Sequence, residues 1–178
     1  MPKIKLFIAT TLDGFIARED GSLDWLTGMP NPGQTDHGYN EFIQSIDTIV
    51  MGRKTYQEVL GFGVPWPYAD CMTYVATTNS RFETSTPSTG IIRAINSETI
   101  QQLRLGSSKN IWLVGGGEII TAFLNEHAID EMIISVVPII LGKGIRLFAH
   151  QPAETHFELV SSTAFDTGVV NLEYCKTA

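Results

Sequence analysis

The stretch IWLVGGGEII, residues 111–120, joins an apolar run to three glycines and then to a segment with helical spacing. Ile119, Ile120, Phe123 and Leu124 recur on one face of a helix, so we expect a buried strand, a tight turn and a helix. Glycines at the turn let a ligand approach the backbone closely, and the positive end of the following helix favours a phosphate. A plain strand-to-helix connection is the alternative, because a glycine cluster alone is a weak signal.

The composition predicts one domain spanning residues 1–178, since this length suffices for a sizeable core. Hydrophobic residues make up 43% of the chain and charged residues 17%, as in ordinary globular proteins. No stretch has the length and apolarity of a membrane span, and the N-terminus lacks the apolar core of a signal peptide. We therefore expect a cytoplasmic protein without a membrane partner, in which Cys71 and Cys175 stay reduced.

The charge of the chain limits its partners. A formal net charge of −7 argues against general binding to nucleic acid or to anionic membranes. If the ligand is phosphorylated, cations must gather at its site, so the placement of the twelve Lys and Arg residues matters more than their number. No metal site is expected, because the four histidines, His37, His127, His150 and His156, show no ligand spacing.

Strand-like and helix-like segments alternate through most of the chain. Strands are expected at 3–10, 47–51, 71–77, 91–92, 111–114 and 131–137. One helix is expected to begin at Asp36, with Tyr39, Phe42, Ile43 and Ile46 inward. A second follows Gly52, with Tyr56, Val59 and Leu60 inward. A third is capped by Asn96, buries Ile100 and Leu103, and ends at Gly106.

The last part of the chain has a different pattern. Phe157 and Leu159 alternate with polar residues, a turn follows at 166–168, and Val170, Leu172 and Tyr174 alternate again, which predicts an antiparallel hairpin. The whole chain is thus expected to form an α/β fold with a mostly parallel sheet. Two loops, 29–38 and 138–148, are long, and long ordered loops are usually functional.

Residues 52–55 follow a predicted strand and are suited to an anion. Arg53 and Lys54 lie in the first turn of a helix, where cations oppose the helix dipole at a cost of roughly a few tenths of a kcal/mol each. An anion bound between them removes this cost, Gly52 leaves room for it, and Thr55 adds a hydroxyl donor. The alternative is that both cations point into solvent.

Residues 77–81, TTNSR, follow another strand end. The hydroxyls of Thr77 and Thr78 and the guanidinium of Arg81 suit a second phosphate, such as the 2′-phosphate of NADPH, although the segment alone is also a common polar turn. With 52–55 and 115–118, three turns offer phosphate donors, about as many as one dinucleotide needs. A G-x-G-x-x-G motif after the first strand is absent, which disfavours the usual Rossmann fingerprint.

Five segments resemble the dihydrofolate-reductase-like superfamily, and within it the branch similar to the reductase domain of the bacterial riboflavin-biosynthesis deaminase-reductase. They are IATTLDGFIA (8–17), IVMGRKTY (49–56), YVATTN (74–79), WLVGGGEII (112–120) and DEMIISVVPIILGKGIRLF (130–148). The segments occur in the family's order and run through most of the chain. The resemblance implies a three-layer αβα fold with an antiparallel C-terminal hairpin, and NADPH as hydride donor.

The resemblance also implies which residues meet the coenzyme. The nicotinamide would be lined by Ala9, Thr10 and Ile16. Phosphates would be held by Gly52, Arg53, Lys54 and Thr55, with Arg53 or Lys54 near the adenosine end, and the adenosine phosphate would meet Thr77 and Thr78. The nicotinamide ribose and the pyrophosphate would rest on Val114, Gly115, Gly116, Gly117, Glu118 and Ile119. The family joins its glycine pair in this turn by a cis peptide, and Gly115–Gly116 is the counterpart.

Asp36 is the candidate catalytic residue. Reducing a C=N bond needs a proton as well as a hydride, so a carboxyl group in a partly apolar pocket would help. The resemblance places Asp36 where dihydrofolate reductases have the acid that binds the pterin ring, while the alternative is a helix N-cap. The family's Trp before that acid is replaced by residues 29–32, MPNP, which weakens the case for folate activity, and Trp25 is a substitute cover for the pocket.

Two other groups of residues have alternative interpretations. Asp13 is interpreted as a turn residue that borders the cofactor. Lys143 and Arg146 would meet an anionic substrate or else lie in a solvated loop, and the second interpretation is preferred.

Together these observations predict an NADPH-dependent oxidoreductase that acts on a small heterocycle of the pterin or pyrimidine type, similar to the reductases of riboflavin biosynthesis. The alternative is a binding protein on the same fold, which holds a nucleotide or another small molecule without turnover. By resemblance a homodimer is also expected, formed through the C-terminal hairpin.

Overall fold

Apolar residues alternate between two sides of the central strands, and this alternation creates the layers of the fold. In the computed structural model, which describes residues 1–177, β1 (Ile4–Thr11) sends Ile4 and Leu6 into one buried cluster and Phe7 into another. β6 (Asn110–Gly115) does the same, with Leu113 on the first side and Trp112 on the second. Each central strand is thus covered on both faces, as expected for a parallel sheet.

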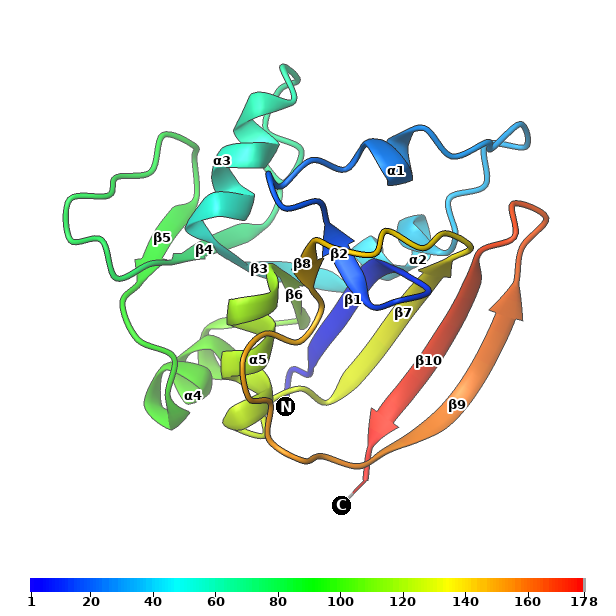
Figure 1. Ribbon diagram of the computed structural model, residues 1–178. Coiled ribbons are helices and arrows are strands. Elements are labelled where there is room, and N and C mark those ends of the chain that lie inside the picture. Colours follow the sequence, from blue (N-terminus) through cyan, green and yellow to red (C-terminus); the bar gives the residue numbers. More distant parts are fainter. Residues whose placement is uncertain (178) are drawn as a thin grey trace.

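The main sheet has eight strands in the order β5-β4-β3-β6-β1-β7-β10-β9 (Figure 1). The remaining strands are β3 (Ile46–Gly52), β4 (Met72–Ala76), β5 (Thr89–Ile92), β7 (Glu131–Val137), β9 (Phe157–Ala164) and β10 (Val170–Lys176). All pairs from β5 to β7 are parallel, and β10 runs antiparallel to both β7 and β9. The predicted α/β class with an antiparallel hairpin at the end is confirmed.

Helices pack on both faces of this sheet (Figure 1). α4 (Ser97–Gly106) and α5 (Gly117–Asn125) contribute to the cluster around Leu6 and Leu113. α2 (Tyr39–Gln44) and α3 (Arg53–Gly61) contribute to the cluster on the other side. The short α1 (Asp24–Thr27) places Trp25 in a third cluster with Val137 and Val169. The predicted three-layer αβα fold is confirmed.

α4 forms as its sequence predicts. The side chain of Asn96 accepts a hydrogen bond from the backbone N–H of Thr99 at 2.9 Å, which satisfies one of the free donors of the first turn. Ile100 and Leu103 are buried, and the helix ends at Gly106. In α5, Ile120, Phe123 and Leu124 are buried as expected.

Four local predictions are wrong. A helix was expected to begin at Asp36, but α2 begins at Tyr39 and its N-cap residue is Gly38, so Asp36 precedes the cap. Ile46 was expected on the inner face of a helix but is the first residue of β3, because α2 ends at Gln44 and the chain enters the sheet at once. Leu60 was expected to point inward but is 41% exposed. α3 ends at Gly61, and residues 60–65 are all exposed, so nothing covers this side chain. The segment 138–148 is more than a loop, since β8 (Ile145–Arg146) pairs with β2 (Phe15–Ala17).

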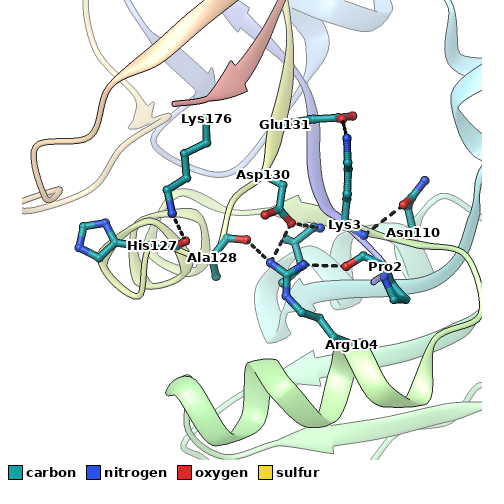
Figure 2. A network of polar contacts seen from close by, with 10 residues as sticks. Pro2, Lys3, Arg104, Asn110, His127, Ala128, Asp130, Glu131 and Lys176 are labelled. Atoms are coloured by element: carbon teal, nitrogen blue, oxygen red, sulfur yellow. Dashed lines mark hydrogen bonds and ion pairs between the residues drawn. The ribbon is translucent and has the colours of Figure 1, made fainter. Parts of the chain in front are cut away.

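At the amino ends of the strands, a polar network joins the first strand to α4 and β7 (Figure 2). Arg104 of α4 donates hydrogen bonds to the carbonyl oxygens of Pro2 and Ala128 at 2.6 and 3.1 Å, and it pairs with Asp130 at 2.8 Å. Lys3 and Lys5 both pair with Glu131. Several cations of the chain are therefore used at the edge opposite the strand ends discussed below.

No helix within residues 1–177 has the length and apolarity needed to cross a membrane. Cys71 and Cys175 are free thiols.

Candidate functional site

The three turns suited to phosphate lie on three neighbouring strands, β4, β3 and β6. The parallel register pairs Gly52 at the end of β3 with Ala76 at the end of β4, and Met51 with Gly115 at the end of β6. Residues 52–55, 77–81 and 115–118 therefore begin at the same level of the carboxyl edge of the sheet.

The turns after β3 and β6 are in contact. A Cβ atom at Gly52 would lie 3.0 Å from Cγ1 of Ile119 and 3.7 Å from the carbonyl oxygen of Gly115. A Cβ atom at Gly116 would lie 3.9 Å from the hydroxyl of Thr55 and 3.9 Å from Cδ1 of Ile16. The structure thus brings together, into one continuous surface, six of the residues predicted to bind the coenzyme: Ile16, Gly52, Thr55, Gly115, Gly116 and Ile119.

The glycines of the β6 turn have distinct roles. The peptide bond between Gly115 and Gly116 is cis, as the resemblance predicts, and Gly115 has a φ of 123°, which favours glycine. Gly117 packs against β8, because a Cβ atom there would collide with the carbonyl oxygen of Arg146 and lie 3.2 Å from that of Leu147. Gly117 therefore permits close packing of two backbones below the turn.

The first turns of α3 and α5 leave their amide donors available. Gly52 and Gly116 are the N-cap residues, and neither helix has a side-chain cap. The first N–H groups of a helix have no partner within the helix. Both helices therefore offer donors to an anion at the carboxyl edge, together with the positive ends of their dipoles.

Cations without a carboxylate partner gather at the same edge. Among the described residues, Arg53, Lys54, Arg81 and Arg93 have no carboxylate within 4.0 Å. Arg53 donates a hydrogen bond to the side-chain oxygen of Gln57 at 3.1 Å, and Arg93 donates to the carbonyl oxygens of Thr77 and Asn79. In a protein with a net charge of −7, this placement fits a ligand with several phosphate groups.

The other predicted coenzyme residues lie around this surface. Thr77 and Thr78 follow β4, and the hydroxyl of Thr77 accepts a hydrogen bond from the N–H of Asn79 at 3.1 Å. Val114 is half-buried, and Glu118 is exposed with a carboxylate oxygen 3.7 Å from Nε2 of His150. Thr10 is buried and donates its hydroxyl hydrogen to the carbonyl oxygen of Phe15 at 3.1 Å. The Thr10 side chain thus holds the turn after β1.

A cleft of about 260 Å³ lies beside these turns, at the carboxyl end of β1. Ala9, predicted to line the nicotinamide, is in its wall. Much of the rest of the wall is apolar or aromatic, from Phe7, Leu26, Met29, Tyr39, Trp112, Val137 and Val169. The rings of Tyr39 and Trp112 meet edge to face with centroids 5.7 Å apart. Such a wall is suited to a flat ring.

Asp36 both lines the cleft and holds the first turn of α2. Its two carboxylate oxygens accept hydrogen bonds from the N–H of Gly38 at 3.1 Å and from that of Asn40 at 2.9 Å. These bonds, the one from Asn40 first, lower the pKa of Asp36. The group is therefore a carboxylate at neutral pH and an acceptor of hydrogen bonds in the cleft.

A buried network fixes the loop that carries Asp36. Asn171 of β10 donates to the carbonyl oxygen of His37 at 2.7 Å and accepts from the hydroxyl of Ser135 at 2.7 Å. Nε2 of His37 lies 2.9 Å from the hydroxyl of Thr167, and its ring meets that of Phe165 edge to face. The β9–β10 hairpin thus holds the 29–38 loop against the cleft.

The sequence predictions did not include four residues of this wall: His37, Tyr39, Trp112 and Ser135. They also did not include Asn171, which lies behind the wall and forms hydrogen bonds with His37 and Ser135. For Ser135 and Asn171, the sequence did contain a signal, which is a polar residue at a position where the pattern of the strand predicts burial. Ser135 interrupts the apolar run of β7, and Asn171 lies within the alternating part of β10. Trp25 does not cover the cleft as predicted, because it is buried behind Val137 and Val169.

Two loop predictions agree with the structure. The carboxylate of Asp13 accepts hydrogen bonds from the hydroxyl of Thr11 at 2.6 Å and from the N–H of Gly142 at 2.7 Å, so Asp13 is a turn residue. Lys143 pairs with Glu19 at 2.8 Å in an exposed loop.

Within residues 1–177, no group of three or more His, Cys, Asp or Glu side chains is arranged to hold a metal ion.

The layered sheet, the cis glycine pair and the adjoining cleft define a dihydrofolate-reductase-like protein. Dihydrofolate reductase from Enterococcus faecalis, solved as a complex with NADP(H), shares this fold with a TM-score of 0.71 at 17% identity, over 99% of this chain and 97% of that one. Residues 66–171 match the family model of the RibD C-terminal domain, and the chain belongs to this family.

Two known proteins have a higher sequence identity to this chain. A protein from Shewanella sp. PV-4, provisionally assigned to riboflavin biosynthesis, has a crystal structure with a TM-score of 0.87 and 32% identity, and 99% of each chain is covered. The uncharacterized protein YwjB of Bacillus subtilis strain 168 is 40% identical over 167 residues, or 94% of each chain.

A more distant neighbour has two enzymatic activities in its name. The diaminohydroxyphosphoribosylaminopyrimidine deaminase/5-amino-6-(5-phosphoribosylamino)uracil reductase of Thermotoga maritima shares the fold with a TM-score of 0.70 at 18% identity. The match covers 99% of this chain and 57% of that one. The family and these neighbours support a reductase domain of the riboflavin-pathway type.

Proposed function

We propose that this protein is an NADPH-dependent reductase that transfers a hydride to a small heterocycle of the pterin or pyrimidine type. The observation that carries the proposal is the position of the three turns. They lie on neighbouring strands, with free helix N-termini and cations without carboxylate partners, and they adjoin an apolar cleft.

The residues present fit the coenzyme. A Cβ atom at Gly52 would lie 3.0 Å from Cγ1 of Ile119, so glycine lets the β3 and β6 turns pack closely together. The free N–H groups at the starts of α3 and α5 are proposed to hold the pyrophosphate. Thr77, Thr78 and Arg81 are proposed to hold the adenosine phosphate, with Arg53 or Lys54 nearby. Ala9, Ile16 and the 114–119 segment are proposed to contact the nicotinamide end. When bound, NADPH supplies the hydride.

The chain's own residues bind and orient the substrate. The rings of Tyr39 and Trp112 and the apolar side chains of the wall exclude water and hold a flat ring beside Ala9. Asp36 is ionised at neutral pH because its pKa is lowered. Its carboxylate accepts hydrogen bonds from ring N–H or amino groups. Its charge also stabilises a proton on the nitrogen of a ring C=N bond, whose carbon takes the hydride.

A second candidate function is binding without turnover. Both oxygens of Asp36 already accept backbone hydrogen bonds, and the lowered pKa disfavours proton donation by this group. If no other route supplies the proton, the same site would hold NADPH and a heterocycle without reaction.

The test has two steps. Titration of the purified protein with NADPH, followed by tryptophan fluorescence, measures binding of the coenzyme. Oxidation of NADPH is then measured with dihydrofolate and with 5-amino-6-(5-phosphoribosylamino)uracil as substrates. Binding with oxidation supports the reductase, binding without oxidation on any tested heterocycle supports the second candidate, and failure to bind NADPH removes the coenzyme from both.

We also propose a homodimer through the C-terminal hairpin. β9 is the outermost strand of the sheet, and Leu159 and Val160 on it are 55% and 62% exposed. An edge strand with exposed apolar side chains is a natural site for pairing with a second chain.

A further inference from the structure

We infer that the substrate cleft takes a heterocycle that carries no phosphate group. The inference rests on the proposed function, since it concerns the substrate of the same site. Its basis is the distribution of charge between the cleft and the neighbouring coenzyme turns.

The cleft has a negative side chain and no cation to oppose it. Asp36 is the only Asp, Glu, Lys or Arg among the described residues that line it. His37 also lines the cleft, but its Nε2 is engaged with the hydroxyl of Thr167 at 2.9 Å. Ser135 directs its hydroxyl hydrogen to Asn171. The wall therefore offers a phosphate neither a positive charge nor a hydroxyl donor from Ser135.

Of the three cations in the neighbouring loops, two are paired with carboxylates and the third lies over an aromatic ring. Arg18 pairs with Asp24 at 2.6 Å, and Lys143 pairs with Glu19 at 2.8 Å. Arg146 lies over the ring of Phe15, with its guanidinium carbon 5.3 Å from the ring centroid. The backbone of Arg146 packs against Gly117, which places this residue beside the β6 turn.

By contrast, Arg53, Lys54, Arg81 and Arg93 occur at the ends of β3, β4 and β5, and none of them has a carboxylate partner among the described residues. The other described cations without a carboxylate partner are Arg146, beside the β6 turn, and Lys109 and Lys176, which donate to the carbonyl oxygens of Gln44 and His127. Most of the positive charge without a carboxylate partner thus lies where the phosphates of a dinucleotide would bind. The substrate cleft lies on the other side of β6, along β1 and β7.

A phosphate monoester in the cleft would be unfavourable for two reasons. It carries a charge of about −1.5 to −2 at neutral pH, which the Asp36 carboxylate repels. It would also lose water against apolar walls without gaining charged hydrogen bonds. The volume of about 260 Å³ lies just below the range of roughly 300–1,000 Å³ for ligand pockets, so it suits a ring system with small substituents.

The experiment compares one compound with and without its phosphate. 5-amino-6-(5-phosphoribosylamino)uracil and the same compound after treatment with a phosphatase are titrated into the protein, with and without NADPH, and binding is followed by tryptophan fluorescence. We expect the phosphate-free form to bind at least tenfold more tightly. Equal binding, tighter binding of the phosphorylated form, or failure of the phosphate-free form to bind would each overturn the inference.

Two matched variants test the cause. Asp36→Asn removes the negative charge of the cleft, so the preference for the phosphate-free form is expected to fall at least threefold. Glu41→Gln makes the same change of net charge on the exposed face of α2, outside the cleft, and is expected to leave the preference unchanged. An unchanged preference in Asp36→Asn, or an equal fall in both variants, contradicts the inference.

The experiment distinguishes a failure of the substrate inference from a failure of the proposed NADPH binding. NADPH binding is measured on the same samples, and its loss would refute the proposed function while the titrations without NADPH still test the substrate preference. Normal NADPH binding with a preference for the phosphorylated compound would refute the inference alone.

Discussion

At the residue scale, Gly117 shows how a missing side chain positions a site. Replacement by Ala places a Cβ atom against the carbonyl oxygens of Arg146 and Leu147, which are backbone atoms and yield little. We expect Gly117→Ala to destabilise the protein by about 1–3 kcal/mol, the usual cost of overpacking. NADPH binding is expected to weaken as well, because the β6 turn must shift. Urea unfolding and NADPH titration measure the two effects.

Gly106→Ala is the matched control for that substitution. A Cβ atom there would meet nothing within 4 Å, and the residue lies at the end of α4, before β6, whereas the turn follows the other end of that strand. The control should leave NADPH binding unchanged. If Gly117→Ala behaved like Gly106→Ala, the packing of the turn against β8 would not control the site.

Asp36 is expected to contribute stability that depends on pH. Backbone hydrogen bonds lower its pKa in the folded state, compared with a value of about 3.9 for an ordinary Asp. The unfolded chain therefore binds this proton more tightly, so the stabilisation is complete above about pH 5 and is lost as the pH falls through the lowered pKa. Urea unfolding of wild type and Asp36→Ala at steps from neutral to acid pH should show a difference that shrinks with acidity. A constant difference would contradict this prediction.

At the scale of the element, α4 depends on its N-cap. Asn96→Ala removes the side-chain acceptor for the N–H of Thr99 and is expected to lower the free energy of unfolding by about 0.5–2 kcal/mol. Asn96→Asp keeps an acceptor and should retain most of the stability. Thermal or urea unfolding of the three proteins checks this, and equal loss in both variants would show that the cap is not the cause.

The turn after β4 is expected to distinguish NADPH from NADH. Arg81 has no carboxylate partner among the described residues and follows Thr77 and Thr78. Arg81→Gln should weaken NADPH binding about tenfold, since a hydrogen bond to a charged group contributes roughly 1.5–3 kcal/mol. Binding of NADH, which lacks the 2′-phosphate, should change little. Parallel titrations with the two coenzymes make the measurement.

Lys109→Gln is the control for charge. Lys109 lies before β6, at the amino edge of the sheet, and donates to the carbonyl oxygen of Gln44. Its loss changes the net charge equally but is far from the carboxyl edge. If both variants weakened NADPH binding alike, the general field of the protein would be responsible and the turn would have no specific role.

At the scale of the whole molecule, the proposed dimer can be tested at the edge of the sheet. Sedimentation should give twice the chain mass of 19.6 kDa. Val160→Lys on β9 should shift the protein toward the monomer, because a charged side chain opposes edge pairing. Leu105→Lys on α4, where the side chain is also exposed, should have no effect. A monomeric wild-type protein would refute the proposal.

Local patterns along the chain predicted most of the elements. The periodicity of Ile100 and Leu103, the cap at Asn96 and the glycines at 115–117 each act within a few residues, so their consequences can be read without knowing the fold. The prediction for Leu60 is wrong although its spacing is helical. Leu60 lies in the last turn of α3, where no other part of the protein covers its side chain.

The candidate site was predictable only in part. The three turns could be proposed because each directly follows a strand, and parallel strands bring their carboxyl ends to one edge. The cleft was not predictable, because its wall joins residues as distant as His37 and Ser135, which Asn171 connects through hydrogen bonds. Their contacts depend on β10 pairing with β7, and strand pairing across such a separation has no local signal.

The sequence by itself determined the α/β class, the order of strands and helices along the chain, and the residue types available to hold phosphate. These follow from hydrophobic period, capping and backbone freedom, which are properties of short segments. The tertiary structure decided which turns lie side by side, that Asp36 both holds α2 and faces a cleft, and that the available cations lie outside this cleft. Those features depend on the order of strands in the sheet, which results from packing of the whole chain.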